Sequence, residues 1–112
     1  MELWHNPRCS KSRAAKAILD DRQVVYVERR YLEDPPDAAT LERVLNALGK
    51  EPWEITRMGE DKAKILGLRA HDRREWIAVL AANPLLIERP ILIADDRRAV
   101  LGRPPEKVKE LL

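Results

Sequence analysis

The fold is decided at the start of the chain, by residues 2–28, which read ELWHNPRCSKSRAAKAILDDRQVVYVE. Residues 2–5 predict a short strand, and Asn6-Pro7 predicts a turn after it. Residues 10–21 predict a helix whose inward residues are Ala14, Ala17, Ile18 and Leu19. The β-branched run at 24–28 predicts a second strand. Two strands joined by a helix form a βαβ unit, so we expect them to be parallel.

The middle of the chain predicts helices. Asp34-Pro35-Pro36-Asp37 breaks the chain and caps a helix that Gly49 ends. The apolar residues of this helix follow the spacing i, i+3, i+4 and i+7, at Leu41, Val44, Leu45 and Leu48. Residues 50–82 predict a helical insertion, with turns near Gly59 and Gly67 and an apolar stripe at Trp76, Ile77 and Leu80.

The last third predicts a hairpin and one more helix. Residues 91–94 and 99–101 predict two strands joined by a turn at Asp95-Asp96. Pro104 then opens a helix with Val108, Leu111 and Leu112 inward. Strand, helix, strand, helices, hairpin and helix in this order predict an α/β fold: a small mixed sheet flanked by helices, as in the thioredoxin-like plan. We expect one domain over residues 1–112, with the insertion at about 50–82.

Composition narrows the class of protein. The 112 residues are 45% hydrophobic and 36% charged, which is typical of a globular protein rather than a disordered or membrane-spanning one. No signal peptide or spanning segment is evident, and the single cysteine suits a reducing compartment, so we expect a cytoplasmic monomer. The arginine pairs are scattered among acidic residues, which disfavours binding of nucleic acid. One cysteine and two histidines make no recognisable metal site.

Cys9, the only cysteine, is the first candidate for chemistry. It could be an inert, small buried residue, which is a common fate of a lone cysteine. However, a helix that begins near Ser10 would direct free backbone N–H groups and the positive end of its dipole at the thiol. Arg8, Lys11 and Arg13 add positive charge nearby. Both effects favour a reactive thiolate.

Two polar neighbours have either a functional or an ordinary explanation. His5 ends the strand before the cysteine and could reach the thiolate, or it could be a plain strand-end histidine. Ser12 could support the site through a hydrogen bond, or it could only cap the first helical turn. The residue pattern leaves both alternatives open.

Three arginines stand apart from the paired ones: Arg57 in EITRMGED, Arg89 in LIERPILI and Arg103 in VLGRPPEKV. Arg89 and Arg103 each follow an apolar stretch and precede a proline, which places them at the ends of predicted strands. Guanidinium groups bind oxyanions through paired donors. The three arginines could also be ordinary surface residues, and their spacing alone does not exclude this.

The motifs WHNPRCSKSR, YLEDPPDAATL, ITRMGED, LIERPILI and LGRPPEKV occur in order along the chain. Together they resemble the glutaredoxin-linked arsenate reductase family of the thioredoxin superfamily. The resemblance implies that Cys9 is the nucleophile, that His5 helps to lower its pKa and that Ser12 supports it. It further implies that Arg57, Arg89 and Arg103 hold arsenate, and that the peptide bond before Pro90 is cis.

The resemblance also implies the partners. Arsenate reduction takes two electrons, and a chain with one thiol cannot form its own disulfide, so the second thiol must come from outside. The family supplies it as glutathione, a co-substrate rather than a bound cofactor, with glutaredoxin resolving the mixed disulfide. The phosphatase-like arsenate reductases are excluded because they need Cys-x5-Arg, and Ala15 stands where that arginine would be.

Two alternatives share the expected fold. One is a transcriptional regulator that binds RNA polymerase, although such regulators commonly carry Cys-x-x-Cys, and Ser12 stands at the second position. The other is a glutathione-dependent thiol reductase without arsenate activity. Such a relative would keep Cys9 but need not keep a third arginine, so Arg103 favours arsenate.

Overall fold

A computed structural model describes residues 1–60 and 67–112, and these residues form one sheet of four strands in the order β2-β1-β3-β4. The strands are β1 (Glu2–Trp4), β2 (Val27–Arg29), β3 (Ile91–Asp95) and β4 (Arg98–Leu101). The α-helices described are α1 (Ser10–Asp21), α2 (Ala38–Leu48) and α4 (Arg73–Ala82). Shorter 3₁₀ segments are η1 (Pro52–Ile55), η2 (Leu68–Ala70), η3 (Pro84–Leu86) and η4 (Pro105–Leu111).

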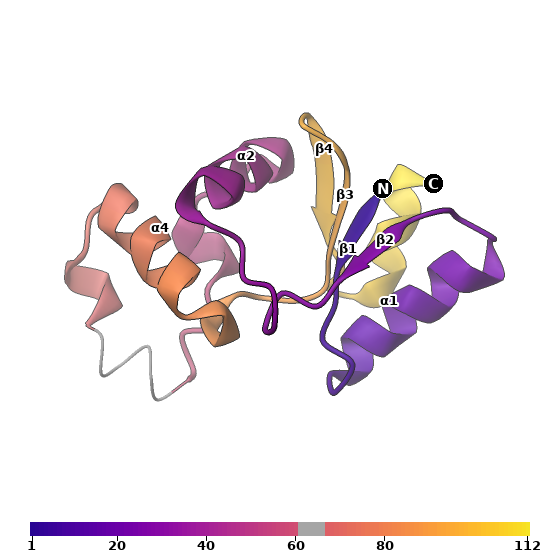
Figure 1. The fold of residues 1–112 in the computed structure, drawn as a ribbon, viewed down its shortest axis with the longest axis horizontal. Coiled ribbons are helices and arrows are strands. Elements are labelled where there is room, and N and C mark those ends of the chain that lie inside the picture. The colour runs from indigo at the N-terminus through magenta and orange to yellow at the C-terminus, as the bar shows by residue number, and fades with distance from the viewer. Residues whose placement is uncertain (61–66) are drawn as a thin grey trace.

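The strand directions confirm the predicted topology. β1 is parallel to β2, with Leu3 beside Glu28, so the chain does begin with a βαβ unit. β3 is antiparallel to β1 and pairs with β4 in the predicted hairpin. The sheet is therefore mixed, and helices cover both of its faces (Figure 1). This is the expected thioredoxin-like plan.

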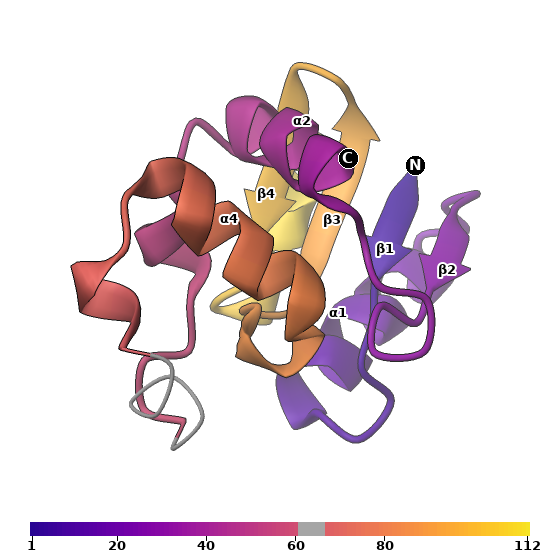
Figure 2. The same ribbon diagram turned by 60° about the vertical axis from the view of Figure 1, so that its left-hand side comes forward.

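The core lies on both faces of the sheet because neighbouring side chains of a strand point to opposite sides. Leu3 and Leu92 are buried with Ala15, Leu19 and Val108, on the face that α1 and η4 cover. Trp4 and Ile91 are buried on the other face, together with residues of α2 and α4. Figure 2 shows α2 and α4 in front of the sheet and α1 behind it. Each short central strand thus anchors two clusters at once.

Helix α2 forms as its sequence predicts. The carboxylate of Asp37 accepts a hydrogen bond from the backbone N–H of Thr40 at 2.8 Å, which caps the first turn. Gly49 ends the helix with a φ of 66°, a left-handed conformation that glycine adopts at little cost. Leu41, Val44 and Leu45 are buried, and Leu48 packs partly buried beside them.

The insertion packs against α2 on the same side of the sheet. Its expected turn near Gly59 is present, and Gly67 precedes η2 with a φ of 61°. Trp76, Ile77 and Leu80 are buried along α4, as predicted. The part of the insertion prediction that concerns residues 61–66 lies outside the described residues.

The inward face of α1 was predicted correctly at Leu19 but wrongly at Ala14 and Ala17. Ala14 and Ala17 are exposed, whereas Ala15 and Leu19 are buried and Ile18 is partly buried. Alanines mark the inward face of a helix weakly, because so little apolar area distinguishes one from the next. The helix is rotated so that its first buried residue is the polar Ser12. The hydroxyl of Ser12 makes hydrogen bonds to the loop before the helix.

The limits of three other elements also differ from the predictions. The second strand is Val27–Arg29 rather than 24–28, and Val25 is 90% exposed because β2 is an edge strand with β1 as its sole partner in the sheet. The hairpin turn lies at residues 96–97, one position later than predicted. The last helix is a 3₁₀ segment that Pro104 caps; Val108 is buried, but Leu112 is 39% exposed.

Within residues 1–60 and 67–112, no helix has both the length and the apolar character that crossing a membrane requires.

Candidate active site

The candidate functional residues gather at one end of the sheet, where β1 and β2 finish. Trp4 of β1 pairs with Arg29 of β2 and with Ile91 of β3, and Ile91 pairs with Leu101 of β4. These pairs mark the last rung of the sheet at this end. The segments beyond it carry the candidates Cys9 after β1, Arg89 before β3 and Arg103 after β4, and they also carry Tyr31 after β2, which the sequence analysis did not single out. Ligands of α/β sheets characteristically bind beyond the carboxyl ends of parallel strands.

The loop from His5 to Cys9 is held by its own hydrogen bonds. The Cys9 N–H donates to the carbonyl of Asn6 at 3.0 Å, and the Arg8 N–H donates to Asn6 Oδ1 at 3.0 Å. Arg13 reaches back from α1 and donates to the carbonyl of Pro7 at 3.0 Å. Asn6 therefore closes the turn through both its backbone and its side chain, which fixes the position of Cys9.

Cys9 is the N-cap residue of α1, with extended backbone angles and a partly exposed side chain. Burial alone would raise the pKa of its thiol. The N–H of Ser12, the Arg89 guanidinium and the N–H of Lys11 together outweigh burial, so that the pKa is lowered. The thiol makes no aligned cap hydrogen bond, so these N–H groups act on it as oriented dipoles at the helix N-terminus. The site thus favours the nucleophilic thiolate.

This lowered pKa predicts how Cys9 reacts with pH. The rate of alkylation by iodoacetamide should reach half its maximum below pH ~8.5, the ordinary thiol value, because the thiolate persists to lower pH in the folded protein. The same titration of the protein unfolded in guanidinium provides the reference, since unfolding removes both the helix dipole and Arg89. Coincident midpoints in the two titrations would contradict an activated thiolate.

His5 and Ser12 are both buried, and they bind each other rather than standing apart. His5 Nδ1 lies 2.7 Å from Ser12 Oγ, and Ser12 Oγ also accepts the backbone N–H of Asn6 at 3.0 Å. Burial lowers the pKa of His5, so the imidazole is neutral at pH 7. The pair thereby tethers the first turn of α1 to the end of β1. Their effect on catalysis stays a prediction.

Arg89 lies against the thiol from the other side of the site. Its peptide bond to Pro90 is cis, as the resemblance implied, and so is the bond from Arg103 to Pro104. Pro90 packs closely on β4's end, where its carbonyl accepts the Gly102 N–H at 2.8 Å. A Cβ at residue 102 would lie 2.8 Å from Pro90 Cγ, so this contact requires glycine. Arg89 Nε and Nη1 are buried and have no hydrogen-bond partner among the described residues.

The other two arginines are brought to the same end of the sheet but are already paired. Arg57 follows the bridge between Thr56 and Ile87, and its Nη1 lies 2.8 Å from Glu60 Oε1. Arg103 Nε donates to the carbonyl of Arg89 at 2.9 Å. The backbone bridge next to Arg57, not its ion pair with Glu60, joins it to the segment just before Arg89.

Glu88 is a feature of the site that the sequence analysis missed. Its Oε2 lies 3.0 Å from Arg103 Nη1, although the angle is not that of a hydrogen bond. Arg57 and Arg103 each face a carboxylate, whereas Arg89 faces the thiol. In the sequence, only the positions of two acidic residues indicate this pairing. Glu88 directly precedes Arg89-Pro90, and Glu60 directly follows Arg57-Met58-Gly59.

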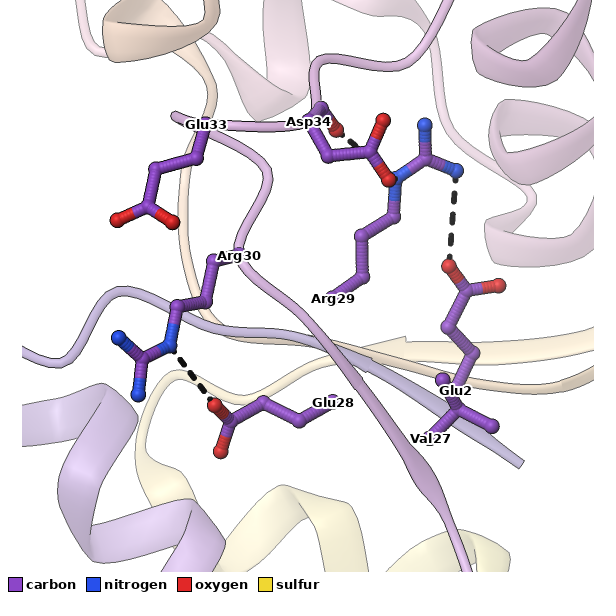
Figure 3. A pocket seen from close by; sticks show the side chains of 7 residues that line it. All are labelled: Glu2, Val27, Glu28, Arg29, Arg30, Glu33 and Asp34. Carbon is purple, nitrogen blue, oxygen red and sulfur yellow. Dashed lines mark hydrogen bonds and ion pairs between the residues drawn. The ribbon is translucent and has the colours of Figure 1, made fainter.

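A pocket lies away from these residues, along the β2 edge of the sheet (Figure 3). Ion pairs tie both of its arginines to three of its four carboxylates. Arg29 Nη1 lies 3.6 Å from Glu2 and its Nε 3.4 Å from Asp34, while Arg30 Nε lies 3.0 Å from Glu28. Such ion pairs along an edge strand discourage pairing with another chain, so this pocket is better explained by protection of the edge than by a ligand.

Among the residues that the structure describes, no three or more histidine, cysteine and acidic side chains are arranged to hold a metal ion.

Comparison with known proteins identifies the family of this chain. The model of the ArsC family matches residues 4–111, which include Cys9 and all three arginines. The chain belongs to the ArsC family. Similar solved structures include an arsenate reductase from Vibrio cholerae, which is 37% identical, with a TM-score of 0.94, over 100% of this chain and 98% of its own. The thioredoxin-like fold of ArsC proteins is thus the fold of this chain.

Sequence relatives of this ArsC chain carry differing names. An arsenate reductase from Neisseria meningitidis serogroup B is 38% identical over 100% of this chain and 97% of that protein. An uncharacterized protein in the glnII region of Streptomyces viridochromogenes is 49% identical over 100% of this chain and 98% of its own. A global transcriptional regulator, Spx 2 of Bacillus cereus, is 23% identical over 98% and 85%.

Proposed function

We propose that this protein is an arsenate reductase that uses Cys9 as its nucleophile. The observation that carries the proposal is the arrangement of Arg89, whose Nε and Nη1 are buried beside a thiol with a lowered pKa and have no hydrogen-bond partner within residues 1–60 and 67–112. A buried guanidinium with free donors is complementary to an oxyanion that carries paired oxygens. The arsenate reductases among its relatives support arsenate as that oxyanion.

The reaction then divides into two steps. The Cys9 thiolate attacks arsenic, an S–As bond forms, and one arsenate oxygen leaves as water after protonation. Arg57, Arg89 and Arg103 hold the remaining oxygens and stabilise their negative charge. Ion pairs with Glu60 and Glu88 keep Arg57 and Arg103 at the edge of the site before the substrate enters.

Reduction of arsenic requires a second thiol, and Cys9 is the only one in the chain. We assign this role to glutathione. Its sulfur bonds to Cys9 Sγ as the S–As bond breaks, and the S–As electron pair remains on arsenic, which leaves as arsenite. The two thiols have then lost two electrons and arsenic has gained two. Glutaredoxin reduces the mixed disulfide on Cys9 and restores the thiolate, a cycle suited to the reducing cytoplasm.

A reconstituted assay tests this function. Purified protein, arsenate, glutathione and glutaredoxin should together produce arsenite, and omission of either thiol component should stop multiple turnover. If thioredoxin alone supports full turnover, the assignment of glutathione and glutaredoxin is wrong, whereas arsenate reduction itself would stand.

The same proposal predicts a trapped intermediate. With arsenate and glutathione but no glutaredoxin, the protein should gain one glutathione on Cys9, because nothing then resolves the mixed disulfide. Intact-mass spectrometry should show this single addition, and dithiothreitol should remove it. Incubation without arsenate is the control and should leave most of the protein unmodified.

A regulator or thiol reductase of the same fold would behave differently. The 23% identical regulator from Bacillus cereus is the reason to test a regulatory function as an alternative. Either alternative predicts no adduct that depends on arsenate. An adduct formed equally with and without arsenate would therefore favour the thiol reductase over the proposed function.

A further inference from the structure

The hydroxyl of Tyr31 is buried without a partner. The side chain is 1% exposed, and among residues 1–60 and 67–112 the hydroxyl oxygen has no hydrogen-bond partner. Leaving a buried hydroxyl unpaired costs free energy, commonly about 1–3 kcal/mol. A phenylalanine would fill the same space without this cost. Packing alone therefore does not explain why this side chain carries a hydroxyl group.

The surroundings of this hydroxyl are those of the active site. Tyr31 follows β2 at the same end of the sheet where Cys9 follows β1. The charged groups that act on the phenol are Arg89, Cys9, Arg57 and Glu88, which are the groups that form the site. Its hydroxyl therefore interacts electrostatically with Arg89, whose Nε and Nη1 likewise have no hydrogen-bond partner among the described residues.

These orphaned donors match the needs of one ligand. A tetrahedral oxyanion that a thiolate attacks keeps up to three oxygens besides the one that leaves, and each accepts hydrogen bonds. Arg89 offers two buried donor nitrogens, and Tyr31 offers one buried O–H. Burial raises the pKa of Tyr31 to about 12, so the phenol keeps its proton at neutral pH and can donate it.

We propose that Tyr31 is a substrate-binding residue whose hydroxyl donates a hydrogen bond to an oxygen of the oxyanion held by Arg89 at Cys9. This inference rests on the proposed function, which supplies the oxyanion. Tyr31 is a neutral donor near the guanidinium groups of Arg89 and Arg57, so it adds directionality to the site without adding charge.

Tyr31→Phe is the direct test, because it removes one oxygen atom and keeps the ring. Tyr26→Phe is the matched control, since the other tyrosine of the chain bonds Lys16 and Asp20 near the protein surface. Two measurements are made on each protein. One is the concentration of arsenate that protects Cys9 from iodoacetamide without glutathione, and the other is kcat/KM for arsenite formation.

Tyr31→Phe should need about tenfold more arsenate for protection and should lose about tenfold in kcat/KM, the size expected for a hydrogen bond to a charged ligand. Its melting temperature should equal or exceed that of the wild type, because an unpaired buried hydroxyl is removed. Tyr26→Phe should stay within twofold of the wild type in both measurements of the site.

Other outcomes distinguish a failure of the proposed role of Tyr31 from a failure of the proposed arsenate reductase function. Protection of Tyr31→Phe within twofold of the wild type, or a fall in its melting temperature that leaves it unfolded, overturns the role of Tyr31. If arsenate protects the wild type but no arsenite forms, the proposed function fails and the role of Tyr31 is judged on protection alone. If arsenate does not protect the wild type, both proposals fail.

Discussion

Replacing Cys9 by serine should lower arsenite formation by about 10⁴-fold or more, to the rate of the solution without protein. The serine hydroxyl does not ionise near pH 7, so neither the helix N-terminus nor Arg89 can convert it into a comparable nucleophile. It also cannot form the disulfide with glutathione that completes the reduction. Arsenite measured in the reconstituted assay provides the test, with wild-type protein in parallel.

This substitution carries its own control for folding. Cys9 is the N-cap of α1 and makes no cap hydrogen bond through its side chain. Serine is a preferred N-cap residue, so the free energy of unfolding should be unchanged or slightly higher. A variant that is as stable as the wild type but retains a tenth of its activity would show that the nucleophile is another group.

Replacing Arg89 by lysine should reduce kcat/KM for arsenate by about 10²-fold or more, the loss typical when an oxyanion donor is removed. Lysine keeps the positive charge but offers a compact ammonium in place of paired planar donors. The unpartnered Nε and Nη1 of Arg89 are the donors that disappear. Because the charge remains, alkylation of Cys9 by the neutral iodoacetamide should change much less than arsenate reduction.

Arg97→Lys is the matched control for this second substitution. Arg97 lies exposed in the hairpin turn, where its backbone N–H, which lysine retains, donates to Asp95 Oδ1 at 2.8 Å. Its kcat/KM should stay within twofold of the wild type. Equal losses of arsenate reduction and of Cys9 alkylation in Arg89→Lys would instead indicate a disturbed site, and would contradict a specific role for the paired donors.

The parts of this protein that sequence predicted well are those where local rules act together. In α2, the Asp37 cap, the spacing of Leu41, Val44 and Leu45, and Gly49 all specify the same helix. The βαβ start was predictable because a helix between two strands leaves few connections that are sterically allowed. Cys9 was predictable as an N-cap thiol for the same reason, since the turn and the helix start are adjacent in sequence.

Predictions failed where local signals were weak or where packing chose between them. The alanines of α1 gave no strong inward face, and the contact of Ser12 with His5 and Asn6 decided the rotation of the helix. Val25 belongs to a β-branched run but is 90% exposed, because the edge strand has one partner and pairs only from Val27 onward. Periodicity in a single sequence does not encode which strand lies at an edge.

By itself, the sequence determined the order of the elements, the thiol at a helix N-terminus and the resemblance that set Cys9 and the three arginines apart. Only the tertiary structure decided which of the arginines are paired and which donors are left free. Glu60 and Glu88 form ion pairs with Arg57 and Arg103, whereas Arg89 and Tyr31 have buried donors with no hydrogen-bond partner in the part of the chain that the structure describes. The physical reason is that a hydrogen bond depends on distances and angles of a few tenths of an ångström, which arise when segments far apart in sequence meet at one end of the sheet.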